Sequence, residues 1–121
     1  MERTIYTKFF TYAQTNSGGS YDYNGVTGIG NYVIIEALDA DHANLLAERA
    51  GIYFNGCESG IDCNCCGDRW HSMEHEESGK IAPMIYEYGL DVPIPYLSDT
   101  IAFIHYLDGS FEQVTLIRKE A

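Results

Sequence analysis

Apolar and polar residues follow two different periods in the first half of the chain, and the change of period predicts strands followed by a helix. Residues 4–14 are rich in Thr, Tyr, Phe and Ile and contain no Gly or Pro, which predicts a half-buried strand. Residues 31–37, NYVIIEA, have an apolar centre that predicts a strand buried on both faces. We therefore expect two strands before residue 38.

A single main helix is expected directly after the second strand. Asp39 can cap its start, and Gly51 can end it. Between them, small and apolar residues recur at spacings of three and four on one face, namely Ala43, Leu46, Ala47 and Ala50. Because this face is mostly alanine, the helix should lie close against a sheet. Residues 52–54 are then expected to resume extended structure, which makes a strand–helix–strand unit.

A long flexible loop is expected at residues 15–30, which hold five of the twelve glycines together with Asn, Ser and Asp. Loops longer than about 12 residues in a compact domain are usually functional or disordered, so this loop is a candidate binding edge. Its glycines allow backbone N–H groups to approach an anion, although no Walker sequence follows them. A flexible hairpin connection is the structural alternative. The candidate ligand-binding residues here are Asn16, Ser17, Gly18, Gly19, Ser20 and Tyr21.

The second half of the chain predicts a loop, short edge segments and a hairpin. Residues 73–80 are charged and should be exposed, and the prolines within 81–97 confine the apolar pieces there to edges or irregular segments. Asp108 and Gly109 separate two strand-like runs and predict a C-terminal β-hairpin. The whole chain, residues 1–121, is expected to be one α+β domain, with an antiparallel or mixed sheet of about four or five strands and one main helix.

Composition and charge narrow the classes of partner. With 45% hydrophobic and 21% charged residues, the chain should fold rather than stay disordered. The formal net charge of −11 repels phosphate backbones and anionic lipid surfaces, so double-stranded nucleic acid and membranes are disfavoured as partners. No apolar run approaches the roughly 18 residues of a membrane span, and MERTIYTKFF lacks the features of a signal peptide. We expect a cytoplasmic protein with free thiols.

The segment GIDCNCCGDRW, residues 60–70, is the densest candidate site and has a first interpretation as a zinc knuckle. Cys63 and Cys66 have the C-x-x-C spacing, followed by a glycine that permits a tight turn around the metal. Tetrahedral zinc needs two more ligands, which nearby Cys57, Cys65, His71 and His75 can supply. The two histidines would share a face if that segment were helical. The predicted ligand set is Cys57, Cys63, Cys66 and His71.

Two other interpretations of this segment stay open. In one, Arg69 grips a phosphate and Trp70 stacks on a base, with Asp68 beside them and the cysteines forming the turn that presents the pair. The structural alternative is an arginine paired with a neighbouring acid. In the other, a cysteine acts as a nucleophile with His71 or His75 as its base, although no motif supports that arrangement.

Aromatic residues add to the candidate binding surface. The chain has ten tyrosines, and tyrosine is enriched at binding surfaces and oligomer interfaces as well as in half-buried sheets. Five of them lie in or beside the long loop and its neighbouring strands, namely Tyr12, Tyr21, Tyr23, Tyr32 and Tyr53. His42 and His105 have no apparent partner and are assigned no role.

Three segments read together carry a resemblance: FFTYAQTNSGGS, NYVIIEALDADHANLLAERAGIYFNG and GIDCNCCGDRW. Over residues 8–70 the chain resembles small proteins carried by phages and prophages, with FTYxQxNSGGS and GIDCxCCGDRW motifs. It is similar to phage anti-defence proteins, in particular the anti-Thoeris sponges. That resemblance implies a small oligomeric α+β protein that sequesters cyclic ADP-ribose isomers or cyclic oligonucleotides without cleaving them.

Two hypotheses of function follow from the sequence. The first is a non-enzymatic, homo-oligomeric binding protein that captures a small nucleotide-derived signal, with a pocket shared between protomers. The second is an acidic interaction protein, either zinc-stabilised or purely thiol-containing, that inhibits a host protein through its acidic surface by imitating nucleic acid. The first predicts a basic, aromatic pocket in an acidic shell, whereas the second predicts one contiguous acidic face.

Overall fold

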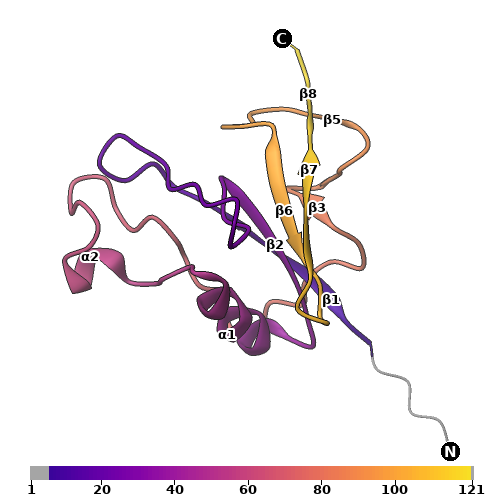
Figure 1. Ribbon diagram of the computed structural model, residues 1–121, viewed down its shortest axis with the longest axis horizontal. Coiled ribbons are helices and arrows are strands. Elements are labelled where there is room, and N and C mark those ends of the chain that lie inside the picture. The colour runs from indigo at the N-terminus through magenta and orange to yellow at the C-terminus, as the bar shows by residue number, and fades with distance from the viewer. Residues whose placement is uncertain (1–5, 121) are drawn as a thin grey trace, which may run out of the picture.

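A mixed four-stranded sheet with one helix packed on it forms the centre of the computed structural model, which describes residues 6–120 (Figure 1). The predicted α+β class is confirmed. The strands are β1 (Lys8–Ala13), β2 (Tyr32–Ala37), β3 (Met84–Ile85), β4 (Tyr88–Gly89), β5 (Pro93–Ile94), β6 (Ile101–His105), β7 (Phe111–Thr115) and β8 (Ile117–Arg118), and the helices are α1 (Ala40–Ala50) and α2 (Gly56–Ser59). None of the helices in residues 6–120 is long and apolar enough to cross a bilayer.

The sheet has the order β1-β2-β6-β7, with β2 and β6 parallel at its centre and an antiparallel strand on each side. In this register Ile35 lies beside His105, and His105 lies beside Phe111. The predicted C-terminal hairpin is confirmed as β6 and β7, which are joined by a turn at Asp108–Gly109. The Asp108 carboxylate accepts the N–H of Ser110 at 2.9 Å in this turn.

β2 carries two separate cores because its side chains alternate between the faces of the sheet. Val33 and Ile35 point toward α1 and pack with the alanines of the helix. Tyr32 and Ile34 point to the opposite face, where they pack under the segments that contain β3, β4, β5 and β8. The expected burial of this strand on both faces is therefore confirmed, since five of its six residues are buried.

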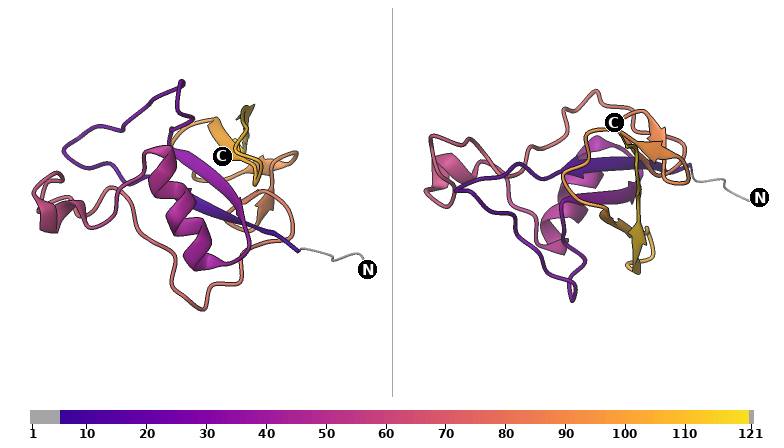
Figure 2. Two further views of the ribbon diagram at one scale, coloured as in Figure 1. Left: turned by 60° about the horizontal axis from the view of Figure 1, so that its bottom comes forward. Right: turned by 90° about the horizontal axis from the view of Figure 1, so that it is seen from above.

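The helix is confirmed with the predicted ends. The side chain of Asp39 accepts the N–H of His42 at 2.8 Å, and Gly51 ends the helix with φ 120°, donating its N–H to the carbonyls of Ala47 and Glu48. Ala43 and Ala47 are fully buried, so α1 lies close across β1 and β2 (Figure 2). Small side chains therefore set the distance between helix and sheet.

The prediction of a strand at residues 52–54 is wrong. Ile52 is buried in the core on the α1 side, but the segment is irregular and leads into α2. The place beside β2 is taken by β6, which arrives from 64 positions further along the chain, so residues 52–54 have no strand to pair with. The first strand is confirmed over Lys8–Ala13, whereas residues 4 and 5 of its predicted range lie outside the described residues.

Loops form the end of the molecule that lies beyond the last residue of β1. α2 and the loop of residues 15–30 project together from this end (Figures 1 and 2). The backbone N–H of Cys63 donates to the Ser17 hydroxyl at 3.2 Å, which ties the two segments directly. On the other face of the sheet, β3 pairs with β4 and β5 pairs with β8, so the proline-containing segments make the expected short edge strands.

Candidate functional site

Arg69 lies at the end of the cysteine loop, residues 60–70, and its buried side chain connects that loop to the glycine-rich loop, residues 15–30. Its Nη1 donates to Gln14 Oε1 at 2.9 Å and to the Ser20 carbonyl at 2.7 Å, while Nη2 donates to the Ser17 carbonyl at 2.8 Å. Nε donates to the Tyr53 hydroxyl at 3.1 Å. Arg69 is only 7% exposed, so four of its N–H donors are used within the chain.

Two carboxylates balance this guanidinium. Asp62 Oδ1 lies 3.8 Å from Nε of Arg69, and Asp22 Oδ2 lies 3.4 Å from the same atom. Asp62 is buried, and it also accepts the backbone N–H of Arg69 at 2.8 Å and the Tyr53 hydroxyl at 2.7 Å. Burial raises the pKa of Tyr53, as does its hydrogen bond to Asp62. The four groups form one satisfied network that holds the loops in place.

Trp70, the other half of the expected ligand-contact pair, is a core residue with 1% exposure. It packs on the α1 side of the sheet with Phe10, Tyr12 and Ile52. The structure therefore places Arg69 and Trp70 in the interior, and Trp70 lines a third cavity of about 350 Å³ together with Asp22 and Tyr23. The arrangement matches the structural alternative, an arginine paired with acids, because a guanidinium this buried needs charge partners inside the protein.

The loop of residues 16–21 turns its carbonyl groups inward, since Ser17 and Ser20 both accept hydrogen bonds from Arg69. Ser17 is buried and bridges to Ser20, with Gly18 and Gly19 at φ 71° and 82° forming the tight turn between them. Asn16, Ser20 and Tyr21 are exposed. The loop is therefore anchored at its base and exposed at its tip.

Sequence reasoning missed Gln14, which organises the start of this loop. Gln14 is buried; its Nε2 donates to the carbonyls of Asp22 and Gly30 at 3.0 Å, and its Oε1 accepts the N–H of Asp22. A buried amide that satisfies three backbone groups fixes a loop as firmly as a short strand pair does. The signal in the sequence was the glutamine at the end of the FTYxQ motif.

Three cysteines come together at the tip of the neighbouring loop. The sulfurs of Cys63, Cys65 and Cys66 lie within 4.8 Å of one another and can hold a metal ion. Cys63 is half-buried, and the other two are exposed. The chain turns sharply here, because the N–H groups of Cys66 and Gly67 both donate to the Cys63 carbonyl at 3.1 Å, with Gly67 at φ 84°.

The predicted zinc ligands are gathered only in part. Cys63 and Cys66 are in the cluster, but Cys65 takes the third place, and Cys57 and His71 are not among the grouped ligand atoms. Residues 71–79 contain no helix, so His71 and His75 do not share a helical face; His75 instead pairs with exposed Asp41 at 2.7 Å. Within residues 6–120, no hydrogen bond joins a cysteine to a histidine in support of the nucleophile interpretation.

Hydrogen bonds inside the cluster shift the pKa values of its thiols in opposite directions. The pKa of Cys63 is lowered, chiefly because the Cys65 thiol hydrogen-bonds to it, and also because backbone N–H groups of Cys65 and Cys66 point at its sulfur. The same contacts raise the pKa of Cys65 to about 11. Asp68 Oδ1 accepts the N–H of Cys57 at 2.9 Å, which lowers the pKa of that carboxyl and fixes α2 beside the cluster.

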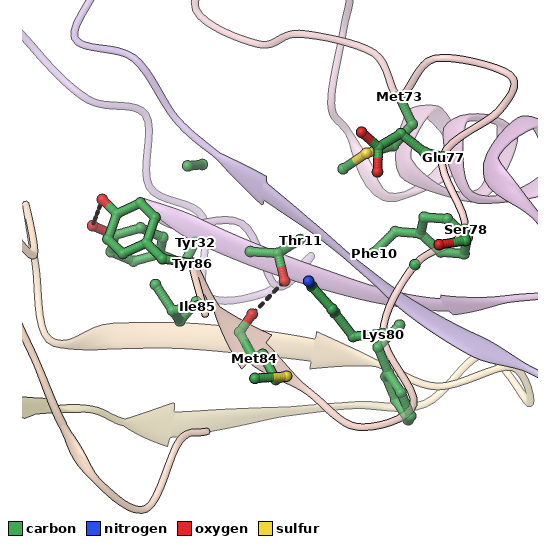
Figure 3. Close-up of a pocket in the computed structure, with 13 residues that line it drawn as sticks. Phe10, Thr11, Tyr32, Met73, Glu77, Ser78, Lys80, Met84, Ile85 and Tyr86 are labelled. Carbon is green, nitrogen blue, oxygen red and sulfur yellow. Dashed lines mark hydrogen bonds between the residues drawn. The ribbon is translucent and has the colours of Figure 1, made fainter. Parts of the chain in front are cut away.

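A first cavity of about 310 Å³ lies between β1, the segment of residues 77–80 and β3 (Figure 3). Several of its polar side chains already have partners. Thr11 donates to the Met84 carbonyl at 2.5 Å, and the hydroxyls of Tyr32 and Tyr86 lie 3.3 Å apart. Lys80, which lies beside Thr11 in Figure 3, pairs with Glu87 at 3.3 Å. This cavity therefore offers an arriving anion little unpaired positive charge.

A second cavity, of about 470 Å³, lies between α1 and the β6–β7 hairpin. The rings of His105 and Phe111 stack along one side of it with centroids 5.1 Å apart. The Nε2 atom of His105 lies 2.7 Å from the Gly28 carbonyl, and burial lowers the pKa of the imidazole. A neutral ring with its N–H on Gly28 is thereby favoured, which leaves the stacked pair as an aromatic wall.

Arg49 lines this cavity from the last turn of α1. Across residues 6–120, its guanidinium makes no ion pair and no hydrogen bond. Asp108 lines the cavity as well, and its hydrogen bonds to Ser110 lower the pKa of its carboxyl, so it is ionised at neutral pH. Sequence reasoning singled out neither Arg49 nor a role for His105, because only the parallel register of β2 and β6 brings the hairpin beside α1.

A comparison with known proteins shows the family to which the chain belongs. Residues 7–120 match a domain of unknown function, DUF7296. The chain belongs to the DUF7296 family. The match spans the sheet, the helix, both loops and the C-terminal hairpin, so all the sites described above lie within the family domain. No curated protein and no solved structure matches the chain.

Proposed function

We propose that this protein captures a small nucleotide-derived ligand without cleaving it, and that the ligand occupies the cavity between α1 and the β6–β7 hairpin. One observation carries the proposal: the guanidinium of Arg49, which has no partner among residues 6–120, lines the same cavity as the stacked rings of His105 and Phe111. A ligand in which a phosphate is linked to a base needs a cation and an aromatic face in the same cavity.

Arg49 supplies the phosphate contact. A guanidinium presents its donors in a planar fork that matches two phosphate oxygens, and an arginine that has no partner in the described part of the chain offers those donors to the ligand. The other arginine considered for this task, Arg69, is committed to its buried network. In a chain of net charge −11, most of the surface repels an anion. Its binding is most favourable beside a cation that is not paired with an acid.

Phe111 supplies the stacking face. It is 38% exposed although it stacks against His105, so part of its ring is accessible to a planar base. Stacking of a base on an aromatic side chain is worth about 1–3 kcal/mol and does not select among bases. Asp108 completes the set, because an ionised carboxylate accepts hydrogen bonds from the hydroxyls of a ribose.

Capture rather than turnover is the activity that these groups favour. The cavity histidine points its Nε2 at the Gly28 carbonyl, and Asp108 accepts hydrogen bonds from its own turn. Both side chains are therefore held in fixed positions in the cavity wall. The volume of about 470 Å³ is in the range of small-molecule sites, and a second protomer laid over the open side would bury the ligand further.

The wider proposal follows the resemblance of the chain to phage anti-defence sponges. The ligand class is then a cyclic ADP-ribose isomer or a cyclic oligonucleotide, removed from the host cytoplasm by a homo-oligomer of this protein. Zinc enters the proposal as a structural cofactor at the cysteine loop, since closed zinc sites with thiolate ligands add to folding stability.

The test is isothermal calorimetry of the purified protein against cyclic dinucleotides, cyclic trinucleotides and cyclic ADP-ribose isomers, together with the Arg49→Gln and Phe111→Ala variants. We expect one class to bind and both variants to lose at least about tenfold in affinity. Lys119→Gln is the matched control, since it removes one positive charge outside the cavity and should leave affinity unchanged. An absence of heat with the whole panel, or equal loss in the control, would refute the proposal and favour the acidic-mimic hypothesis.

A further inference from the structure

We propose that the cysteine loop binds one zinc ion through four thiolates, Cys57, Cys63, Cys65 and Cys66, without a histidine. This inference deepens the structural-zinc part of the proposed function and does not depend on the ligand cavity. It replaces the set expected from spacing alone, in which His71 took the place of Cys65. The structure brings together the sulfurs of Cys63, Cys65 and Cys66 within 4.8 Å, and it places no histidine among them in the described residues.

The spacing of the sulfurs is close to that of a metal site. Tetrahedral zinc with Zn–S bonds of about 2.3 Å places its sulfurs roughly 3.8 Å apart. The sulfurs of Cys65 and Cys66 are already 3.7 Å apart. Those of Cys63 and Cys65 are 2.8 Å apart and would open by about 1 Å around an ion. Small side-chain rotations in an exposed loop are sufficient for that change.

The backbone of the loop has the form of a metal knuckle. The N–H groups of Cys66 and Gly67 close a tight turn on the Cys63 carbonyl, and Gly67 leaves the turn in the left-handed region. The N–H groups of Cys65 and Cys66 lie in the same tight turn as the Cys63 sulfur. Such N–H groups hydrogen-bond to a thiolate and hold it in place after the proton has left, which is the role of outer partners in metal sites.

The fourth sulfur comes from α2. Cys57 Sγ lies 3.5 Å from the Cys63 carbonyl oxygen, so it lies next to the first cysteine of the cluster. Asp68 holds the N–H of Cys57, and the Gly56 carbonyl accepts the N–H groups of Ile61 and Asp62. The backbone of α2 is thereby fixed against the knuckle, and a change of rotamer at Cys57 is the movement that closes the site.

A metal here would act on the loops behind it. Cys63 follows the buried Asp62 and donates its N–H to the buried Ser17, so an ion that locks the knuckle also locks both sides of the Arg69 network. Four cysteines of the chain would be accounted for by one site, which explains why they gather within ten positions of a protein with free thiols.

The test is zinc binding by the reduced, full-length protein, followed by a competing chromophoric chelator and by cobalt substitution, whose thiolate charge-transfer bands report sulfur ligands. We expect one zinc per chain. Cys63→Ser and Cys65→Ser should each lose more than about 100-fold in affinity, beyond the roughly 10–100-fold typical of outer partners. Cys57→Ser should lose a similar amount, and His71→Asn should change nothing.

Several results would overturn this inference. No zinc bound to reduced protein, a loss of affinity in His71→Asn equal to that in the cysteine variants, or a Cys63–Cys65 disulfide found by peptide mapping of protein prepared anaerobically would each refute it. Cys65 is exposed, so Cys65→Ser should stay folded and keeps the test interpretable. Failure of zinc binding leaves the calorimetry on the Arg49 cavity unaffected, and the reverse also holds.

Discussion

The guanidinium of Arg69 lies 2.8 Å from the Ser17 carbonyl, across 52 positions of sequence, and this contact holds two irregular loops as one unit. Replacing Arg69 with Met should lower the free energy of unfolding by about 3–5 kcal/mol, because the buried Asp62 loses its positive partner. Urea unfolding measures the change. Arg49→Gln is the control and should shift stability by less than about 0.5 kcal/mol. Equal stability of the two variants would contradict the buried network.

Gly56 can have no side chain because of Asp62. A Cβ built at Gly56 would lie 1.9 Å from Asp62 Oδ2 and 2.8 Å from a ring carbon of Tyr53. We expect Gly56→Ala to displace the carboxylate from Arg69 and to cost about 2–4 kcal/mol. Gly60→Ala is the matched control in the same turn, since a Cβ there meets nothing within 4 Å and only backbone strain of about 1 kcal/mol applies. Thermal unfolding of both variants should separate them clearly.

His105 should make the fold sensitive to mild acid. Its pKa lies below the ordinary value of 6.5 because burial disfavours the charged ring. The unfolded chain therefore takes up a proton first as the pH falls through 6.5, and the free energy of unfolding decreases by up to about 1.4 kcal/mol per pH unit until the folded pKa is passed. The full contribution is present above pH 6.5.

Chemical unfolding at a series of pH values from 8 to 5 measures this effect, with His105→Gln as the comparison. Gln can still donate to the Gly28 carbonyl but cannot titrate, so stability should fall less over this range in the variant than in the native protein. Asp108 lines the same cavity, and its lowered pKa keeps its carboxyl ionised throughout that interval. A slope that persists undiminished in the Gln variant would assign the effect to another group.

Trp70 offers a direct optical test of the interior site. As the sole tryptophan and a residue with 1% exposure, it should emit at short wavelength and resist quenching by iodide in the native state. Unfolding should shift the emission to longer wavelength and restore quenching. Strong quenching of the native protein would place the indole at the surface and revive its interpretation as a base-stacking residue.

Local signals were sufficient for the regular elements. Asp39 and Gly51 mark the two ends of the helix because capping is a short-range interaction. Asp108–Gly109 marks the hairpin turn for the same reason. Residues 52–54 failed because whether an apolar triplet becomes a strand depends on a free partner, and β6 occupies that place. No pattern within a window of ten residues carries that information.

The candidate site was only partly accessible to sequence reasoning. The GIDCNCCGDRW segment did mark an organised region, yet the roles of Arg69 and Trp70 depend on burial, which follows from contacts with Gln14 and the loop of residues 15–30. The sequence did not predict that Arg49 and His105 share a cavity. The two residues are 56 positions apart, and only the parallel strand arrangement brings them together.

The parallel pairing of β2 with β6 also has a consequence for synthesis of the chain. β2, with its sequence YVIIEA, is made 63 residues before the neighbour that covers its open edge. At a translation rate of roughly 5–20 residues per second, that edge stays unpaired for on the order of 3–13 s. An apolar strand exposed for so long is a template for wrong pairing with other nascent chains. Truncated forms that end before Ile101 should therefore aggregate, and expression at low temperature or with chaperones should raise the yield of the full protein.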